Sequence, residues 1–154
     1  MRRAMVLTAV LAACSEDTTP PEDEPVNCAL EDRDDDFAIG LHKSGDGSVL
    51  DFAIMTADPA PPAKYDNTWV IQINQLTSGV VGAPIDGASM IVTPYMPDHE
   101  HAAGKTVRIE PTGTEGQYEL TPINFHMPGL WQTTIEATTP AGDDVVVFRF
   151  CIPS

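Results

Sequence analysis

Three of the chain's four histidines fall in two short segments, residues 96–101 and 125–131, and each segment also contains a methionine. Imidazole nitrogen binds copper and zinc, whereas the soft thioether of methionine prefers Cu(I). A set that combines histidine with methionine therefore favours copper over zinc, calcium or magnesium. The predicted copper ligands are Met96, His99, His101, His126 and Met127.

The spacing within the first segment adds to this prediction. One residue separates His99 from His101, so an extended backbone would place both imidazoles on the same side. Asp98 or Glu100 could then supply an oxygen ligand for Cu(II). The alternative interpretation is an exposed polar loop in a metal-free structural or protein-interaction module. Copper binding requires the two segments to meet in space.

Short β-strands must position these segments. The chain has fourteen prolines and eleven glycines and no long apolar stripe at helical spacing. Alternating apolar residues separated by turn signals indicate an all-β, immunoglobulin-like β-sandwich of seven to eight strands over residues 34–154. A small barrel is the alternative architecture. The predicted strands are residues 37–42, 49–55, 68–76, 89–95, 106–110, 117–123, 130–138 and 144–152.

The first residues are typical of an exported lipoprotein. Two arginines precede an apolar run that is about half as long as a membrane-spanning helix, and Ala12-Ala13-Cys14 follows. This arrangement closely resembles the lipobox of bacterial lipoproteins and predicts a signal peptide over residues 1–13 and a lipid on Cys14. An ordinary signal peptide or a short membrane anchor is the alternative. Because Ser15 and no aspartate follows Cys14, the resemblance implies an outer-membrane anchor facing the periplasm.

An acidic, proline-rich linker is predicted over residues 14–33. Residues 15–25 contain no apolar side chain to bury, so this part should be a solvated tether. The acidic run at residues 31–36 lacks the spacing of a calcium-binding loop and is predicted to be a solvated charge run.

The two other cysteines bracket the predicted domain. Cys28 precedes it and Cys151 lies three residues from its end, so an oxidising compartment should join them in a disulfide. The alternative is that Cys151 acts as a thiolate ligand in a blue-copper site, which also requires nearby histidine and methionine.

The net charge of −15 becomes −17 if residues 1–13, with their two arginines, are removed. Such an acidic chain is repelled by phosphate backbones, so nucleic acid is not an expected partner. We expect a membrane, reached through the lipid anchor, and a copper protein as partners. The chain contains no nucleophile–base motif, phosphate-binding loop or dinucleotide fingerprint, and it is not expected to be an enzyme.

Residues 68–150 resemble YtkA-like domains. The resemblance rests on a strand ending in Met96-Pro97 with the His99/His101 pair just after it, then Gly116-x-Tyr118, then the segment 126–131 leading into a strand. It implies a small β-sandwich of a bacterial envelope protein, of a kind often associated with copper or respiratory oxidases. Residues 34–66 fall outside the resemblance and should add an N-terminal hairpin.

Overall fold

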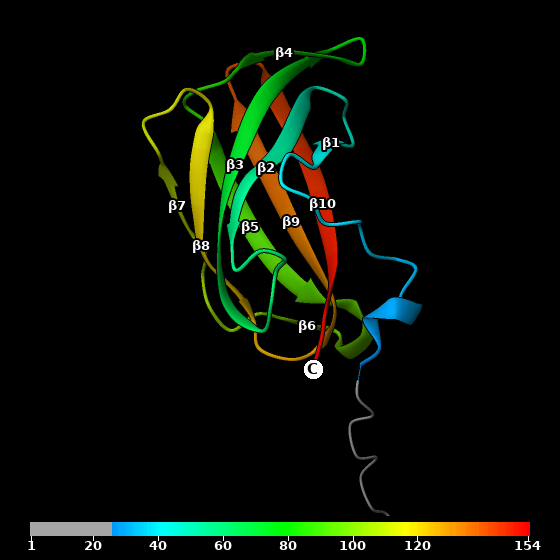
Figure 1. Cartoon of the computed structure of the whole chain (residues 1–154). Coiled ribbons are helices and arrows are strands. Elements are labelled where there is room, and N and C mark those ends of the chain that lie inside the picture. The colour runs from blue at the N-terminus through cyan, green and yellow to red at the C-terminus, as the bar shows by residue number, and fades with distance from the viewer. Residues whose placement is uncertain (1–25) are drawn as a thin grey trace, which may run out of the picture.

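The computed structural model describes residues 26–154 (Figure 1). The predicted signal peptide, the predicted lipidation site at Cys14 and the tether at residues 15–25 lie outside the described residues. Within residues 26–154, no helix is long and apolar enough to cross a membrane.

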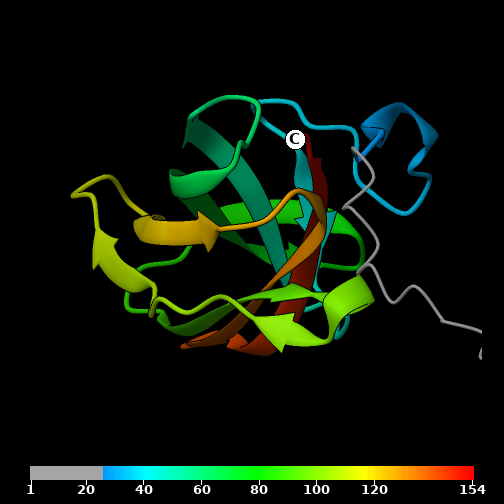
Figure 2. The same cartoon turned by 90° about the horizontal axis from the view of Figure 1, so that it is seen from below.

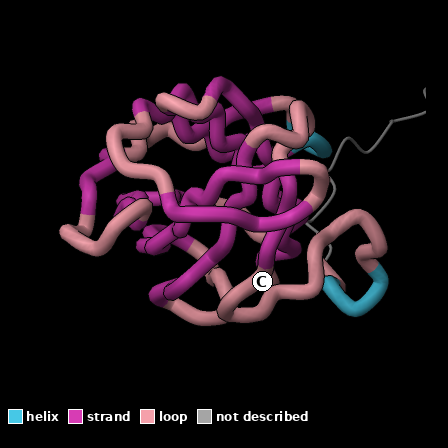
Figure 3. Tube along the Cα trace, turned by 90° about the horizontal axis from the view of Figure 1, so that it is seen from above, coloured by secondary structure: helices cyan, strands magenta, loops and turns pink. Residues whose placement is uncertain are grey.

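Two antiparallel sheets lie face to face (Figures 1 and 3). The larger sheet has the order β1-β2-β3-β8-β7, with β4 also paired to β3, and the smaller has the order β10-β9-β5-β6. The strands of the larger sheet are β1 (His42–Ser44), β2 (Leu50–Asp58), β3 (Tyr65–Thr77), β4 (Val80–Pro84), β7 (Arg108–Pro111) and β8 (Gln117–Phe125). Those of the smaller sheet are β5 (Ser89–Met96), β6 (His101–Ala102), β9 (Gly129–Thr139) and β10 (Gly142–Ile152).

The core fills the space between the sheets because apolar side chains alternate along the long strands. Trp69, Ile71 and Ile73 of β3 are fully buried and face the smaller sheet. Trp69 makes edge-to-face contacts with Phe148 and Phe150 of β10, with ring centroids 6.3 and 5.5 Å apart. Aromatic pairs of this geometry add to the stabilisation from burial.

This arrangement confirms the all-β, immunoglobulin-like sandwich, and the pairing within two separate sheets excludes the small barrel. The predicted number of strands was too low, because residues 26–154 form ten. The two strands that were missed are β4, whose Val80 and Val81 are exposed, and β6, which is only two residues long. Exposed or very short strands give no alternating pattern.

The first strand was also misplaced. It was predicted at residues 37–42 but begins at His42. Gly40 has φ +85° in a turn, and Ile39 is 54 % exposed, so the apolar alternation before His42 does not mark a strand. The left-handed φ of Gly40 is readily adopted only by glycine.

The acidic run at residues 31–36 is only partly solvated. The backbone N–H of Asp35 donates to the carbonyl of Arg149 (2.7 Å), and its carboxylate accepts from the N–H of Arg149 (2.8 Å). The carboxylate of Asp34 accepts from the N–H of Cys151 (3.3 Å). These bonds satisfy backbone groups on the free edge of β10. The prediction of a solvated run was therefore wrong for Asp34 and Asp35.

Cys28 and Cys151, the pair predicted to bridge, form a disulfide with a Cα–Cα distance of 5.5 Å. Cys28 begins the short 3₁₀ helix η1 (Cys28–Leu30), and Cys151 lies on β10. The backbone N–H of Val26 also donates to the Ser154 hydroxyl (3.1 Å). The start of the described chain is thus held beside its C-terminus.

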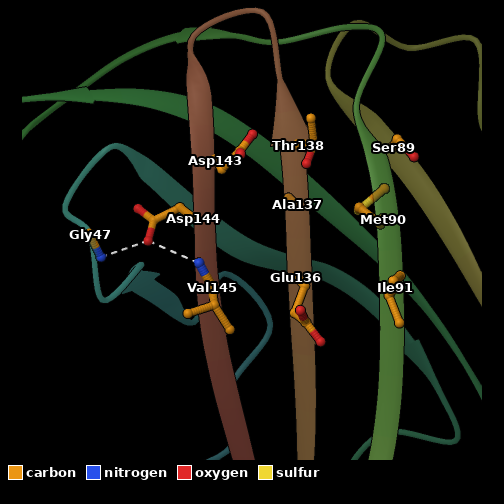
Figure 4. A pocket seen from close by; sticks show the side chains of 10 residues that line it. All are labelled: Gly47, Ser89, Met90, Ile91, Glu136, Ala137, Thr138, Asp143, Asp144 and Val145. Atoms are coloured by element: carbon orange, nitrogen blue, oxygen red, sulfur yellow. Dashed lines mark hydrogen bonds between the residues drawn. The ribbon is translucent and has the colours of Figure 1, made fainter.

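A buried carboxylate lies at the end of the sandwich opposite the disulfide. Asp144 of β10 is 8 % exposed and accepts hydrogen bonds from the backbone N–H groups of Gly47 (2.7 Å), Val49 (2.8 Å), Leu50 (2.9 Å) and Val145 (2.9 Å). Figure 4 shows two of these bonds, from Gly47 and Val145. Asp144 therefore holds the turn between β1 and β2 against the smaller sheet.

Candidate functional site

Three histidines from two separate segments lie close together. The elements that carry them, β6 and the turn between β8 and β9, are at the lower end of the sandwich in Figure 1. His99 ends the 3₁₀ helix η2 (Pro97–His99), His101 begins β6, and His126 lies in the turn between β8 and β9. Pairing of β5 with both β6 and β9 brings the two segments together, and Figure 2 looks onto this end. The topology thus meets the condition that the copper prediction sets.

The imidazoles form a continuous row. The ring centroids of His99 and His101 are 5.9 Å apart, and those of His101 and His126 are 5.1 Å apart. The rings of His101 and His126 are stacked, with 27° between their planes. His99 is exposed, whereas His101 and His126 are half-buried. The row can therefore be reached from solvent at its His99 end.

Trp131 packs against two of the three imidazoles. Its ring lies edge-to-face with His101 (6.0 Å) and His126 (5.2 Å), and the side chain is 1 % exposed. The indole Nε1–H donates to the carbonyl of Met127 (2.9 Å), which fixes both the ring and the turn that carries His126. The spacing of residues 126–131 in the sequence does not reveal this contact between Trp131 and the histidines.

The two methionines occupy different environments. Met96 is 1 % exposed and belongs to the hydrophobic core, where it contacts Gly129. Gly129 has φ +126°, and a methyl group there would overlap Met96 Cε. Met127 is half-buried and packs against the core. Of the two thioethers, only that of Met127 is partly accessible to solvent.

The backbone between His99 and His101 is not extended as predicted. Glu100 has φ 54° and ψ 37°, the left-handed conformation, directly after η2. The contact between the two rings results from this reversal of the chain. A non-glycine residue adopts this conformation at some energetic cost, and sequence spacing alone does not reveal it.

Asp98, one of the two expected oxygen ligands, is already paired. Arg33 donates from Nη1 to Oδ1 and from Nη2 to Oδ2 of Asp98, both at 2.8 Å. Arg33 also donates to both carboxylate oxygens of Glu31, at 2.7 Å each. These bonds from Arg33 hold the pKa of Asp98 and of Glu31 below their usual values and raise the pKa of Arg33, through Glu31 first. Asp98 would serve as an oxygen ligand only by giving up part of its pair with Arg33.

Arg33 has no role in the site predicted from the sequence. The signal that points to it is its position as the only basic residue within the acidic run at residues 31–36.

In this conformation, no three His, Cys, Asp or Glu side chains among residues 26–154 are arranged to hold a metal ion. Ligation by all three histidines requires rotation of the rings about their side-chain torsions. Cys151 is in the disulfide, so the thiolate alternative is wrong.

Two other features lie away from the histidine row. His42 Nδ1 is 2.9 Å from Asp51 Oδ2, and Asp51 is 2 % exposed and also accepts from Asn74 (3.3 Å). A depression of about 480 Å³ lies beside Asp144 on β5, β9 and β10 (Figure 4). Its lining is Gly47, Ser89, Met90, Ile91, Glu136, Ala137, Thr138, Asp143, Asp144 and Val145. It contains no histidine and does not extend the candidate site.

A family model described as YtkA-like matches residues 46–136, more than half of the chain. The match takes in β2, which the sequence analysis left outside the resemblance, and it ends within β9. No curated protein and no solved structure matches the chain significantly. The match contains His99, His101 and His126, together with the turns that bring them together. The chain belongs to the YtkA-like family.

Proposed function

We propose that this chain is a copper-binding domain of the bacterial cell envelope, which buffers the ion or delivers it to another copper protein. The observation that carries the proposal is the row formed by His99, His101 and His126, drawn from two segments onto one end of the fold. The three imidazoles would supply nitrogen ligands. Membership of the YtkA-like family supports an envelope-associated domain.

Rotation of the rings is compatible with their surroundings. None of the three imidazoles is fully buried, so changing their side-chain rotamers would not require unfolding the core. The thioether of Met127, which is half-buried, would serve Cu(I). Met96 would ligate only by leaving its contact with Gly129. The net charge of −15 attracts a cation from solution.

A metal-free interaction module of the cell envelope is the second candidate. It is favoured by the stacking of His101 on His126 and by their edge-to-face contacts with Trp131. In this alternative the imidazoles act as packing groups that shape a docking surface. The two candidates differ in whether the purified protein binds copper.

Replacing His99 and His101 together by asparagine should weaken copper binding by at least about a hundredfold, because two of three nitrogen ligands are lost. The same change at His42, on β1, should leave copper affinity unaltered. The measurement is anaerobic competition for Cu(I) and titration with Cu(II). The affinity for copper should fall as the pH is lowered, because protonated imidazole does not ligate. Cu(I) should stay bound to a lower pH than Cu(II), because thioethers do not titrate. Equal affinity of the wild type and the double variant would favour the interaction module.

The anchoring of the domain is a further part of the proposal. The predicted lipobox supports a chain that is cleaved before Cys14, acylated there and held at the outer membrane facing the periplasm. Cys14→Ala should release the protein from the membrane fraction or leave its signal peptide uncleaved. Mass spectrometry of the mature N-terminus measures this directly. An unmodified Cys14 at the mature start would contradict the proposed anchor.

A further inference from the structure

The smaller sheet turns one face to the core and the other to solvent. Ile135 and Val146 face the core, so the alternate residues of β5, β9 and β10 point outward. Strand pairing places Ile91, Glu136 and Val145 side by side on the solvent side, as Figure 4 shows. The outer face consists of the alternate residues from Ser89 to Tyr95, from Gln132 to Thr138 and from Asp143 to Arg149.

The side chains of the outer face make no hydrogen bond or ion pair with other side chains or backbone groups of residues 26–154. The outward side of the larger sheet differs in this respect. There, the hydroxyls of Thr68 and Thr121 are 2.9 Å apart, and Gln72 donates to the carbonyl of Glu115 (3.0 Å). The polar and charged groups of the outer face are thus available to a partner.

The middle of the outer face is apolar and β-branched. Ile91 of β5 is 63 % exposed, and Val145 and Val147 of β10 are half-buried. Covering exposed apolar side chains on a flat sheet with another surface removes them from water, which is favourable.

The charges of the outer face are divided between its two ends. Glu136 and Asp143 are exposed and line the depression of about 480 Å³ at one end. Arg149 lies six residues beyond Asp143 on β10, a separation of about 20 Å along the strand. The two other arginines of residues 26–154, Arg33 and Arg108, each pair with a carboxylate, whereas the side chain of Arg149 does not.

We propose that the outer face binds a second copy of this chain, with the two smaller sheets face to face. The two-fold axis lies between the sheets and perpendicular to their strands, so each outer face meets itself in the opposite direction. Arg149 of each copy then lies over Glu136 and Asp143 of the other, where the depression can receive its side chain. Val145 of one copy meets Val147 of the other. A purely basic partner would instead place like charge against Arg149.

The dimer is expected to be weak. Three strands about 4.8 Å apart and about 20 Å long offer an area at the low end of specific interfaces, about 1,200 Å² or less for both copies together. Two copies with a net charge of −15 also repel each other. At about 0.15 M salt, this repulsion is screened beyond about 8 Å. A dissociation constant on the order of 10–100 µM follows for these conditions.

Sedimentation equilibrium of the purified full-length chain, from about 1 µM to about 1 mM at about 0.15 M salt, tests the proposal. Arg149→Glu should weaken the dimer at least about tenfold, because the two-fold axis makes each lost ion pair count twice. Arg108→Glu is the matched control, since it changes the net charge equally but lies on β7 of the larger sheet, and it should have no effect. Combining Arg149→Glu with Glu136→Arg should recover part of the lost affinity.

A chain that stays monomeric over this range would overturn the proposal and leave the outer face to a different partner. A dimer that Arg149→Glu and Arg108→Glu weaken equally would also overturn it, because the association would then respond only to net charge. Association through residues 1–25 would be the same in every variant and would count against the outer face. Arg149→Gln, which adds no negative charge, should weaken the dimer less than Arg149→Glu. Unchanged circular dichroism and thermal midpoint in each variant exclude a general loss of structure.

Discussion

Asp144→Ala should lower the free energy of unfolding by about 4 kcal/mol, because it leaves several backbone donors without a partner and removes hydrogen bonds to a charged acceptor. The carboxylate is 8 % exposed and accepts four backbone N–H groups, two of them from the turn between β1 and β2 and one from Leu50 at the start of β2. A domain of this size is stabilised by only about 5–15 kcal/mol in total. Denaturant unfolding at neutral pH measures the loss.

The same carboxylate should make the free energy of unfolding depend on pH in the acidic range. Burial raises the pKa of Asp144, but hydrogen bonds from the backbone of Leu50, Gly47, Val49 and Val145 lower it by more, and the net pKa lies below the usual value. A lowered folded pKa gives stability that is present above the unfolded pKa, about 3.9, and is lost as the pH falls through the folded pKa. The stability difference between the wild type and Asp144→Asn should therefore shrink in acid.

Asp143 provides the matched control. It precedes Asp144 on β10, is exposed, and makes no side-chain hydrogen bond within residues 26–154. Asp143→Ala should change the free energy of unfolding by less than about 0.5 kcal/mol. Equal effects at Asp143 and Asp144 would show that the buried carboxylate is not what holds the turn.

Removing the disulfide should have an effect of similar size. Cys28 and Cys151 are separated by 123 residues, so their bond closes nearly the whole described chain into one loop. The loop-entropy account gives about 4–5 kcal/mol for a loop of this length. Replacing both cysteines by serine should lower the free energy of unfolding by this order, measured by thermal or denaturant unfolding.

The arrangement around the bond provides an internal check. Segment 34–35 stays attached to β10 by hydrogen bonds that do not involve sulfur. The double serine variant should therefore keep the native near-ultraviolet spectrum at low temperature while unfolding earlier on heating. A variant as stable as the wild type would show that the closed loop does not constrain the unfolded chain.

The long buried strands were predictable because their alternation is imposed by burial. Residues such as Trp69, Ile71 and Ile73 face a core that only apolar side chains can fill, so the pattern in the sequence and the strand coincide. The pattern fails where burial does not act. Ile39 and Val80 are apolar yet exposed. Ile39 contributed to the wrong placement of the first strand, and the exposed residues of β4 gave no alternating pattern from which this strand could be predicted.

The composition of the candidate site was predictable, but its geometry was not. Residue type and spacing identified His99, His101 and His126 as one group, since imidazole chemistry is local to each side chain. Their meeting depends on the pairing of β5 with β6 and β9, which is set by contacts distant in the sequence. The left-handed conformation of Glu100 and the pair of Arg33 with Asp98 also depend on the tertiary structure. The sequence indicates them only through one arginine within an acidic run.

The X-ray absorption spectrum of the copper-loaded protein tests the central claim most directly, because it identifies the atoms bound to the metal. For Cu(II) the proposal predicts imidazole scattering from three histidines, reduced by one ring in His126→Asn. For Cu(I) it predicts an added sulfur, supplied by Met127. A spectrum with only oxygen ligands, or one that His126→Asn leaves unchanged, would contradict a site built from the two histidine segments.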